Sequence, residues 1–207
     1  MGWNDGTEQE IYTKDELVKS FSLDRIQNSG ARYDEIKLLW LNGQWIRRIF
    51  DEEGVDALYV RTEGFWPDAA KNYNDVYKKA VLSIIYDRLK VLADLKTMTD
   101  YFFETPRLDL ELLKNNKFLK KLSESELETL LKQTIVKLTA LEKWDADTLQ
   151  AALNELLSET AKKPAELFSL IRIALSFAPF SPALNLTLAV LGREVSLSRL
   201  NAVARSI

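Results

Sequence analysis

The chain has 207 residues, of which 46% are apolar and 29% charged, and its formal net charge is -3. It is long enough to bury a hydrophobic core in one or two domains, and it contains neither cysteine nor histidine. These two absences exclude disulfides, thiolate catalysis, cysteine zinc sites and every Ser-His or Cys-His dyad, so an enzyme of this composition would depend on carboxylates or lysine.

Glycine and proline are scarce, with 7 and 5 copies, which favours long helices over short strands joined by turns. No apolar run approaches the length of a membrane span, and the N-terminal residues are too polar for a secretory signal. We therefore expect a cytoplasmic protein that makes no contact with a membrane.

The N-terminal region contains two helix starts. Thr13 with Glu16 forms a capping-box pair, and Asp34 is a suitable N-cap for the apolar run that follows it. The pair Asn42-Gly43 predicts the end of that helix, because glycine reaches the left-handed conformation of a helix C-terminus. A second helix over 44–50 would then place Trp45 and Ile46 inward and Arg47 and Arg48 mostly in solvent.

The rest of the chain also has helical periodicity, and we find no sustained alternation typical of strands. Ser123 and Glu126 form a second capping box, which opens an amphipathic helix. The segments 60–67 and 104–106 are expected to be a loop and a hinge, which suggests three subdivisions, 1–52, 53–106 and 107–207. Further helices are expected at about 74–90, 109–121, 146–160, 165–176, 183–191 and 197–205.

Arg88 continues the apolar stripe of Tyr77, Val81 and Ile84 on the helix expected at 74–90. Its guanidinium could cap the last carbonyls of that helix, where a cation suits the helix dipole, or snorkel to solvent. Alternatively, it could offer a planar set of donors to a base edge or a phosphate. The sequence leaves both interpretations open.

Arg172 lies in a segment that is apolar on nearly all sides, from Leu167 to Leu175. Burial of an unpaired guanidinium is costly, so this side chain either pairs with an acid elsewhere or lines a groove that receives a ligand. Residues 172–207 carry four Arg and one Glu, so a polyanion partner would be met by a focused basic patch despite the acidic total.

No nucleotide or metal cofactor site is predicted in this chain. Its seven glycines form no phosphate-binding loop, and Ser123 is explained by its position as a helix cap. Acidic runs such as Asp51 to Glu53 and the three lysine pairs are typical of solvated surface.

Several motifs resemble those of one family, in the order in which the family carries them. The chain is similar over nearly its whole length to the C-terminal part of bacterial-type glutamyl-tRNA synthetases, which are class I aminoacyl-tRNA synthetases. The matching motifs are Gly2-Trp3, Glu10-Ile11-Tyr12-Thr13, Phe21 to Arg25, Leu41 to Arg47, Arg88 to Leu92, Tyr101-Phe102-Phe103, Leu167-Phe168, Ile171 to Ser176, Ser181 to Leu184, and Val190 to Glu194.

The resemblance implies an all-α fold, with a helical anticodon-binding cage of two subdomains preceded by a truncated stem-contact region. It assigns 1–52 to that region and 53–106 and 107–207 to the first and second anticodon-binding subdomains. Arg88 falls where the family reads one anticodon base, Arg172, Ser181 and Leu184 where it contacts the others, and Arg47 where it approaches the tRNA stem. Arginine at position 88 also resembles the enzymes that charge only glutamate tRNA.

The resemblance further implies that the partner is tRNA(Glu) and that the catalytic half lies elsewhere in the same parent chain. The family's nucleotide-binding signature requires histidines, which this chain lacks, so we expect a fragment without ligase activity of its own. ATP and Mg would then serve the parent and not this fragment, which we expect to be a monomer. The competing hypothesis is a helical protein-interaction scaffold without RNA binding.

The chain departs from the family pattern at one place. The family usually follows its leucine-threonine pair with glycine, whereas here Leu175-Ser176 precedes Phe177, and the loop from Ala178 to Ser181 is unusual.

Overall fold

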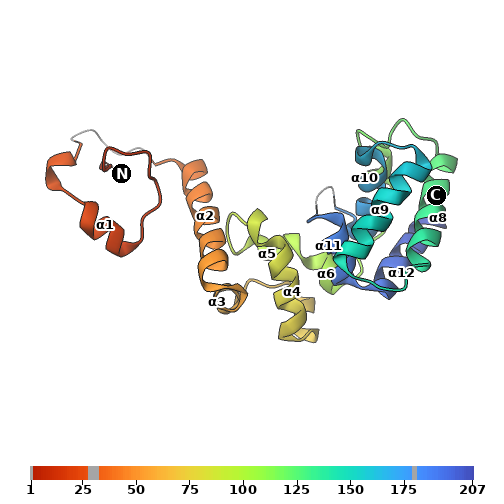
Figure 1. The fold of residues 1–207 in the computed structure, drawn as a ribbon, viewed down its shortest axis with the longest axis horizontal. Coiled ribbons are helices and arrows are strands. Elements are labelled where there is room, and N and C mark those ends of the chain that lie inside the picture. Colours follow the sequence, from red (N-terminus) through yellow and green to blue (C-terminus); the bar gives the residue numbers. More distant parts are fainter. Residues whose placement is uncertain (1, 28–32, 179–180) are drawn as a thin grey trace.

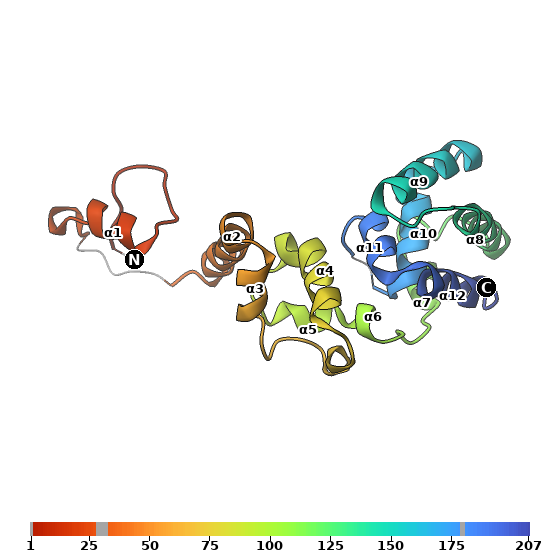
Figure 2. The same cartoon turned by 60° about the horizontal axis from the view of Figure 1, so that its bottom comes forward.

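The computed structural model describes residues 2–27, 33–178 and 181–207. Figures 1 and 2 show an elongated arrangement in which the N-terminal segment lies at one end and a bundle formed by residues 124–204 lies at the other. In the described part of the chain, extended pairing is limited to one antiparallel bridge between Trp3 and Ile26. The predicted all-α class is confirmed. None of the described helices is long and apolar enough to cross a bilayer.

The N-terminal segment is held by a helix cap and a small aromatic cluster. Helix α1 (Lys14–Ser20) opens with the predicted capping box, in which the Glu16 amide donates to the Thr13 hydroxyl and the Thr13 amide donates to the Glu16 carboxylate. No residue of α1 is buried. Trp3 instead packs on Phe21, with ring centroids 5.5 Å apart. The short 3-10 helix η1 (Leu23–Arg25) follows.

Helix α2 (Glu35–Glu53) runs without interruption through Asn42 and Gly43, so the predicted helix end at this pair is wrong. The N-cap was predicted correctly, because the Asp34 carboxylate accepts a hydrogen bond of 3.0 Å from the Lys37 amide. Ile46 is buried and Trp45 half-buried, as expected.

Gly43 allows a close approach between α2 and the loop at Leu89 and Lys90. A Cβ atom built at this buried residue would lie 3.0 Å from the carbonyl oxygen of Leu89 and 3.6 Å from the Cα of Lys90. The Asn42 amide donates to the Lys90 carbonyl at 3.0 Å, which fixes the same contact. Asn42-Gly43 therefore resembles a helix stop in the sequence, but in the structure it is the place where α2 packs against Leu89 and Lys90.

Substitution of Gly43 by valine is expected to destabilise the fold by about 1–3 kcal/mol, because the branched side chain would push α2 away from the Leu89 carbonyl. Urea denaturation of the purified protein measures this change. Glu35→Val, at an exposed position of the same helix, is the control for helix propensity, and an equal loss in both variants would contradict the packing role of Gly43.

The residues from α2 to α6 form what we call the central unit (35–103). A small core of Ile46, Leu58, Leu82, Ile85, Leu89 and Leu95 joins α2 to the helices that follow. The helix predicted at 74–90 is divided: its α-helical part ends at Ile85 and continues as a 3-10 turn. The bounds are α3 (Val55–Arg61), η2 (Asp68–Asn72), α4 (Asp75–Ile85), η3 (Tyr86–Arg88), α5 (Asp94–Met98) and α6 (Asp100–Phe103).

The bundle at the other end is the C-terminal unit (124–204). The predicted helix at 146–160 is confirmed to the residue, and those at 165–176 and 183–191 within one residue; the helix predicted at 197–205 begins four residues earlier. The bounds are α8 (Glu124–Thr139), α9 (Ala146–Thr160), α10 (Pro164–Ser176), α11 (Leu184–Leu191) and α12 (Arg193–Ala204).

The helix predicted at 109–121 is wrong, since only the short helix α7 (Glu111–Lys114) forms there. Asn115 and Asn116 follow it, and the Asn116 side chain accepts a hydrogen bond of 2.9 Å from the Phe118 amide. Asparagine side chains compete with the helix for backbone amides in this way, so the helix ends before its apolar periodicity does.

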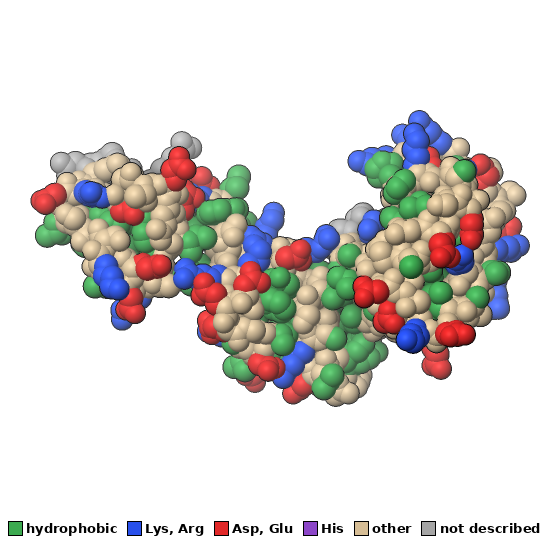
Figure 3. All heavy atoms as spheres, in the orientation of Figure 1, with side chains coloured by type: hydrophobic (Ala, Val, Ile, Leu, Met, Phe, Trp, Pro, Cys, Tyr) green, Lys and Arg blue, Asp and Glu red, His purple; other side chains and the backbone are tan. Residues whose placement is uncertain are grey.

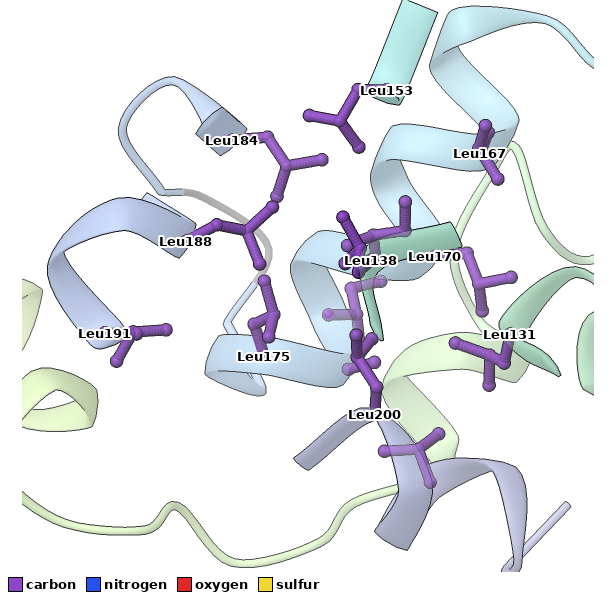
Figure 4. Packing of buried hydrophobic residues seen from close by; sticks show 14 of the residues in the cluster. Leu131, Leu138, Leu153, Leu167, Leu170, Leu175, Leu184, Leu188, Leu191 and Leu200 are labelled. Carbon is purple, nitrogen blue, oxygen red and sulfur yellow. The ribbon is translucent and has the colours of Figure 1, made fainter. Parts of the chain in front are cut away.

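The C-terminal unit is filled mainly by leucine. Figure 4 shows these side chains converging from α8 to α12. Val81 of α4 and the aromatic run Tyr101–Phe103 belong to the same cluster, and α4 packs against α11. The central and C-terminal units therefore share a continuous apolar core. The subdivision boundaries at 52 and 106 stay a prediction.

Candidate nucleic-acid interface

Arg172 lies on α10, where apolar packing holds it at the edge of the core. Its neighbours Ile171 and Ile173 are buried, while Arg172 itself is half-buried. Its Nε donates to the Ser181 hydroxyl at 2.9 Å. No ion pair joins Arg172 to an acid in the described ranges, and the residues outside them include no Asp or Glu. The acid partner considered from the sequence is therefore absent from the part of the chain that the structure describes.

The end of α10 brings Ser181 back to Arg172. Phe177 is the C-cap, with φ of +47°, the left-handed region that favours glycine. The Ser176 hydroxyl accepts a bond of 3.2 Å from the Ala178 amide and donates to the Arg172 carbonyl at 2.9 Å. The turn is thus made without the glycine that the resemblance led us to expect. Pro179 and Phe180, in the same loop, lie outside the described residues.

Arg88 ends the 3-10 turn η3 and is exposed. It donates to no backbone carbonyl among the described residues, so the capping interpretation has no support there; its nearest acid is Asp87, with 4.0 Å between Nε and the carboxylate. Burial lowers the pKa of Arg172, and the positive charge of Arg88 lowers that pKa further. The fold therefore brings Arg88 and Arg172, 84 positions apart, to one surface region (172 minus 88).

Tyr101 lies beside these arginines and is nearly fully buried, with 2% of its surface exposed. Burial raises the pKa of its hydroxyl, and the charges of Arg88, Arg199 and Arg172 act in the opposite direction. The hydroxyl has no hydrogen-bond partner among the described residues. The sequence identified Tyr101 only through the family motif; its position beside the two arginines follows from tertiary packing.

Tyr77 supports the same region from α4, and it gives a pH-dependent prediction. Its hydroxyl donates to the Phe102 carbonyl at 3.0 Å, and burial raises the pKa of Tyr77 to about 12. The folded state thus holds this proton more tightly than the unfolded chain does. The stability from this group is fully present below about pH 10, the ordinary tyrosine pKa, and is lost as the pH rises from about 10 to 12.

The free energy of unfolding of Tyr77→Phe is therefore expected to fall less steeply over this pH range than that of the parent chain. Denaturation at several alkaline pH values measures the difference. Tyr33→Phe is the matched control, because Tyr33 is 75% exposed. An unchanged slope in Tyr77→Phe would contradict the role of this hydroxyl.

Arg47 joins α2 to the same region. Its Nη1 donates to the Asp87 carbonyl at 2.8 Å, one residue before Arg88. Arg48 makes an ion pair of 2.9 Å with Glu52 and lies over the Trp45 ring at 5.3 Å. Both arginines are half-buried, so the expectation that they face mostly solvent is wrong.

The remaining predicted contact residues are placed deeper in the fold. Leu184 begins α11, is 5% exposed, and belongs to the leucine core, where Figure 4 shows it near Leu188. Ser181 is 4% exposed, and its hydroxyl also donates to the Pro182 carbonyl at 3.0 Å. Their contact with RNA stays a prediction.

Two other arginines of the C-terminal unit are bound to backbone carbonyls. Arg193 reaches the carbonyls of Thr139 and Leu141, and Arg199 those of Leu175 and Glu104. The patch expected from the four arginines of 172–207 is therefore smaller than their number suggests. Arg199 was not singled out from the sequence, although it lies on the buried stripe of α12 with Ser196, Leu200 and Val203.

A cavity of about 770 Å³ lies beside Tyr101, between the end of α6 and the end of α10. Its lining includes Tyr101 and Phe177, and three acids accompany one arginine there: Asp100, Glu104, Asp109 and Arg107. In Figure 3 the molecule is hollowed between α2 and the C-terminal unit, and Lys and Arg side chains gather along that hollow. The region thus offers both cationic donors and carboxylate acceptors.

Comparison with known proteins identifies the family. The model of the family "Anticodon binding domain" matches residues 57–204. A glutamate–tRNA ligase of Roseiflexus sp. (strain RS-1) is 32% identical over 209 residues, covering 100% of this chain and 41% of the relative. That of Clostridium novyi (strain NT) is 33% identical over 201 residues, covering 96% and 40%. The chain therefore spans about two fifths of the length of the curated relatives it matches.

Solved structures agree on the fold. A crystal structure of a glutamate tRNA ligase from Elizabethkingia meningosepticum CCUG26117 superposes with a TM-score of 0.78 at 20% identity, covering 99% of this chain and 39% of the other. A glutamate-tRNA synthetase from Elizabethkingia anophelis gives 0.72 at 21% identity, with 99% and 38% covered. The chain belongs to the anticodon binding domain family and corresponds to the C-terminal, anticodon-binding region of glutamate–tRNA ligases.

Proposed function

We propose that this chain recognises the anticodon of tRNA(Glu) and positions that tRNA for aminoacylation by a catalytic half that lies outside the 207 residues. The reaction itself, with its ATP and Mg, would belong to that half, and this part alone would be inactive as a ligase. The relatives of which the chain covers about two fifths are glutamate–tRNA ligases, which supports this assignment.

The observation that carries the proposal is the approach of two arginines from different units. Arg88 comes from the end of η3 in the central unit and Arg172 from α10 in the C-terminal unit. Arg172 forms no ion pair in the described ranges, and Arg88 has only Asp87 beside it, at 4.0 Å. The positive charge of Arg88 lowers the pKa of Arg172, so holding the two like charges in one region has a cost. A polyanion that binds across both would relieve this repulsion.

The chemistry of the region suits unpaired bases. Arginine forks donate to base acceptors and phosphates, and carboxylates such as Asp100 and Glu104 can accept from exocyclic amino groups. Single-stranded RNA is read by such contacts together with stacking on aromatic rings. Arg88, Arg172, Ser181 and Leu184 would contact the anticodon, and Arg47 would orient the stem from α2.

The protein would bind tRNA(Glu) as a monomer in the cytoplasm. Arg88 would favour tRNA(Glu) over tRNA(Gln). The test is a titration of the purified chain with a tRNA(Glu) transcript and with an anticodon-swapped transcript, each at two salt concentrations. We expect tighter binding of tRNA(Glu) and weaker binding at high salt. Equal, salt-insensitive binding of both transcripts, or none, would favour the protein-interaction scaffold instead.

Substitution of Arg88 by alanine is expected to reduce discrimination at one anticodon base by roughly 5- to 150-fold, the effect of about 1–3 kcal/mol for one base contact. The melting temperature should change little, because the side chain is exposed and caps no carbonyl among the described residues. Competition between transcripts that differ at single anticodon positions measures the first effect. A large fall in melting temperature would instead indicate a structural role.

A further inference from the structure

Arg199 occupies the junction between the two units that carry Arg88 and Arg172. It comes from α12, and only 6% of its surface is exposed. Its Nη1 donates to the Leu175 carbonyl at 2.7 Å, in the last turn of α10. Its Nη2 donates to the Glu104 carbonyl at 3.1 Å, just after α6. One planar guanidinium thus links two segments that are 71 positions apart in the chain (175 minus 104).

The surroundings of Arg199 make this arrangement costly for stability alone. Burial lowers the pKa of Arg199, no acid forms an ion pair with it in the described part of the chain, and its Nε has no hydrogen-bond partner there. Well-packed apolar residues often replace a buried charge without loss of stability. A buried arginine that donates only to backbone carbonyls is therefore better explained by the geometry that it imposes.

That geometry bears directly on the candidate interface. Leu175 is three residues from Arg172, and Glu104 is three residues from Tyr101, which lies beside Arg88. The apolar core shared by the two units attracts them without fixing a direction, because hydrophobic contact is not directional. Hydrogen bonds from a rigid fork do fix direction and distance.

We propose that Arg199 is a positioning residue: it sets the separation of Arg88 and Arg172, and so preorganises the surface that receives an RNA anticodon loop. This inference rests on the proposed function for its RNA part, whereas the effect on the separation of the units is independent of it. A preorganised pair of contacts binds more tightly because less ordering is left to the binding step.

The absence of cysteine in the sequence makes a direct test possible. Val76 of α4 and Val136 of α8 are 77% and 70% exposed, so cysteines introduced there can carry spin labels on the central and C-terminal units. Pulsed electron paramagnetic resonance then gives the distribution of distances between the two labels, and so between the units. Arg199→Met removes the fork but keeps an apolar stem, and Arg199→Lys keeps the charge without the planar pair of donors.

Arg193→Met is the matched control. Arg193 is also on α12 and also donates to backbone carbonyls, but those belong to Thr139, Leu141 and Glu142, within the C-terminal unit and the loop after α8. Its loss should lower stability without altering the separation of the two units. The second readout is the affinity for an anticodon stem-loop of tRNA(Glu).

We expect a broader distance distribution and on the order of tenfold weaker stem-loop binding in Arg199→Met, a smaller change in Arg199→Lys, and an unchanged distribution in Arg193→Met. An unchanged distribution in both folded Arg199 variants would overturn the inference, as would equal broadening in Arg193→Met. If the parent chain fails to bind the stem-loop, the proposed function is overturned, and the distance measurements still decide whether Arg199 fixes the two units.

Discussion

Replacement of Arg172 by alanine is expected to weaken the binding of tRNA(Glu) by roughly 5- to 150-fold, the consequence of losing about 1–3 kcal/mol of interaction. Arg172 is half-buried, its side chain bonds to the Ser181 hydroxyl and to no other side chain among the described residues, and the like charge of Arg88 repels it. A group held in this way is free to donate to a base or a phosphate. Filter binding or fluorescence anisotropy at fixed salt measures the loss.

Two variants make that result specific. Arg205→Ala removes the same charge from an exposed position after α12 and should weaken binding much less. Arg172→Lys keeps the charge but not the planar fork, so a loss close to that of the alanine variant would indicate bidentate recognition. If Arg172→Ala and Arg205→Ala weaken tRNA(Glu) binding equally, Arg172 contributes only to the overall electrostatic field of the protein.

Replacement of Leu170 by alanine is expected to lower the free energy of unfolding by about 2–5 kcal/mol, the largest stability effect considered for this chain. Leu170 is 0% exposed and lies on α10 in the core that the central and C-terminal units share. The substitution removes buried methyl groups and leaves a cavity in a close-packed cluster. Urea denaturation followed by circular dichroism measures the change.

Val136→Ala provides the reference for this prediction. Val136 belongs to α8 of the same unit and is 70% exposed, so its truncation should change stability by no more than about 0.5 kcal/mol. A small effect of Leu170→Ala, similar to that of Val136→Ala, would mean that the core of the C-terminal unit collapses around the missing side chain.

The distribution of arginine explains how an acidic chain can present a basic surface. The guanidinium groups of Arg193 and Arg199 donate to backbone carbonyls within the fold, and Arg205 is exposed after α12, whereas Arg172 is half-buried and makes no ion pair in the described ranges. Arg88 and Arg172 together give a small positive region on a protein whose net charge is -3. Such focusing favours a specific polyanion over nonspecific binding.

The sequence was a reliable guide wherever local interactions decide the structure. Thr13, Asp34 and Ser123 were predicted as helix caps, and each accepts the expected amide. Their side chains bond to backbone groups three residues away, so the pattern in the sequence contains the whole interaction. The amphipathic pattern after Ser123 and the helix expected at 146–160 likewise correspond to α8 and α9.

The sequence misled at two helix boundaries. Gly43 resembles a helix stop, yet it serves the approach of the Leu89 carbonyl. The apolar stripe of 109–121 resembles a helix, but Asn116 turns the chain. In each case local propensity was outweighed by a contact or a side-chain hydrogen bond that periodicity does not register.

By itself, the sequence determined the all-α class, most helices of the C-terminal unit and the absence of histidine and cysteine chemistry. It also singled out Arg88 and Arg172 as arginines set among apolar residues. Only the tertiary structure decided that these two arginines lie near each other, that Arg172 bonds to Ser181, and that Arg199 joins their units. Helix caps and stripes depend on neighbours within one or two turns, whereas these contacts join residues from 9 to 95 positions apart and exist only after the units have packed.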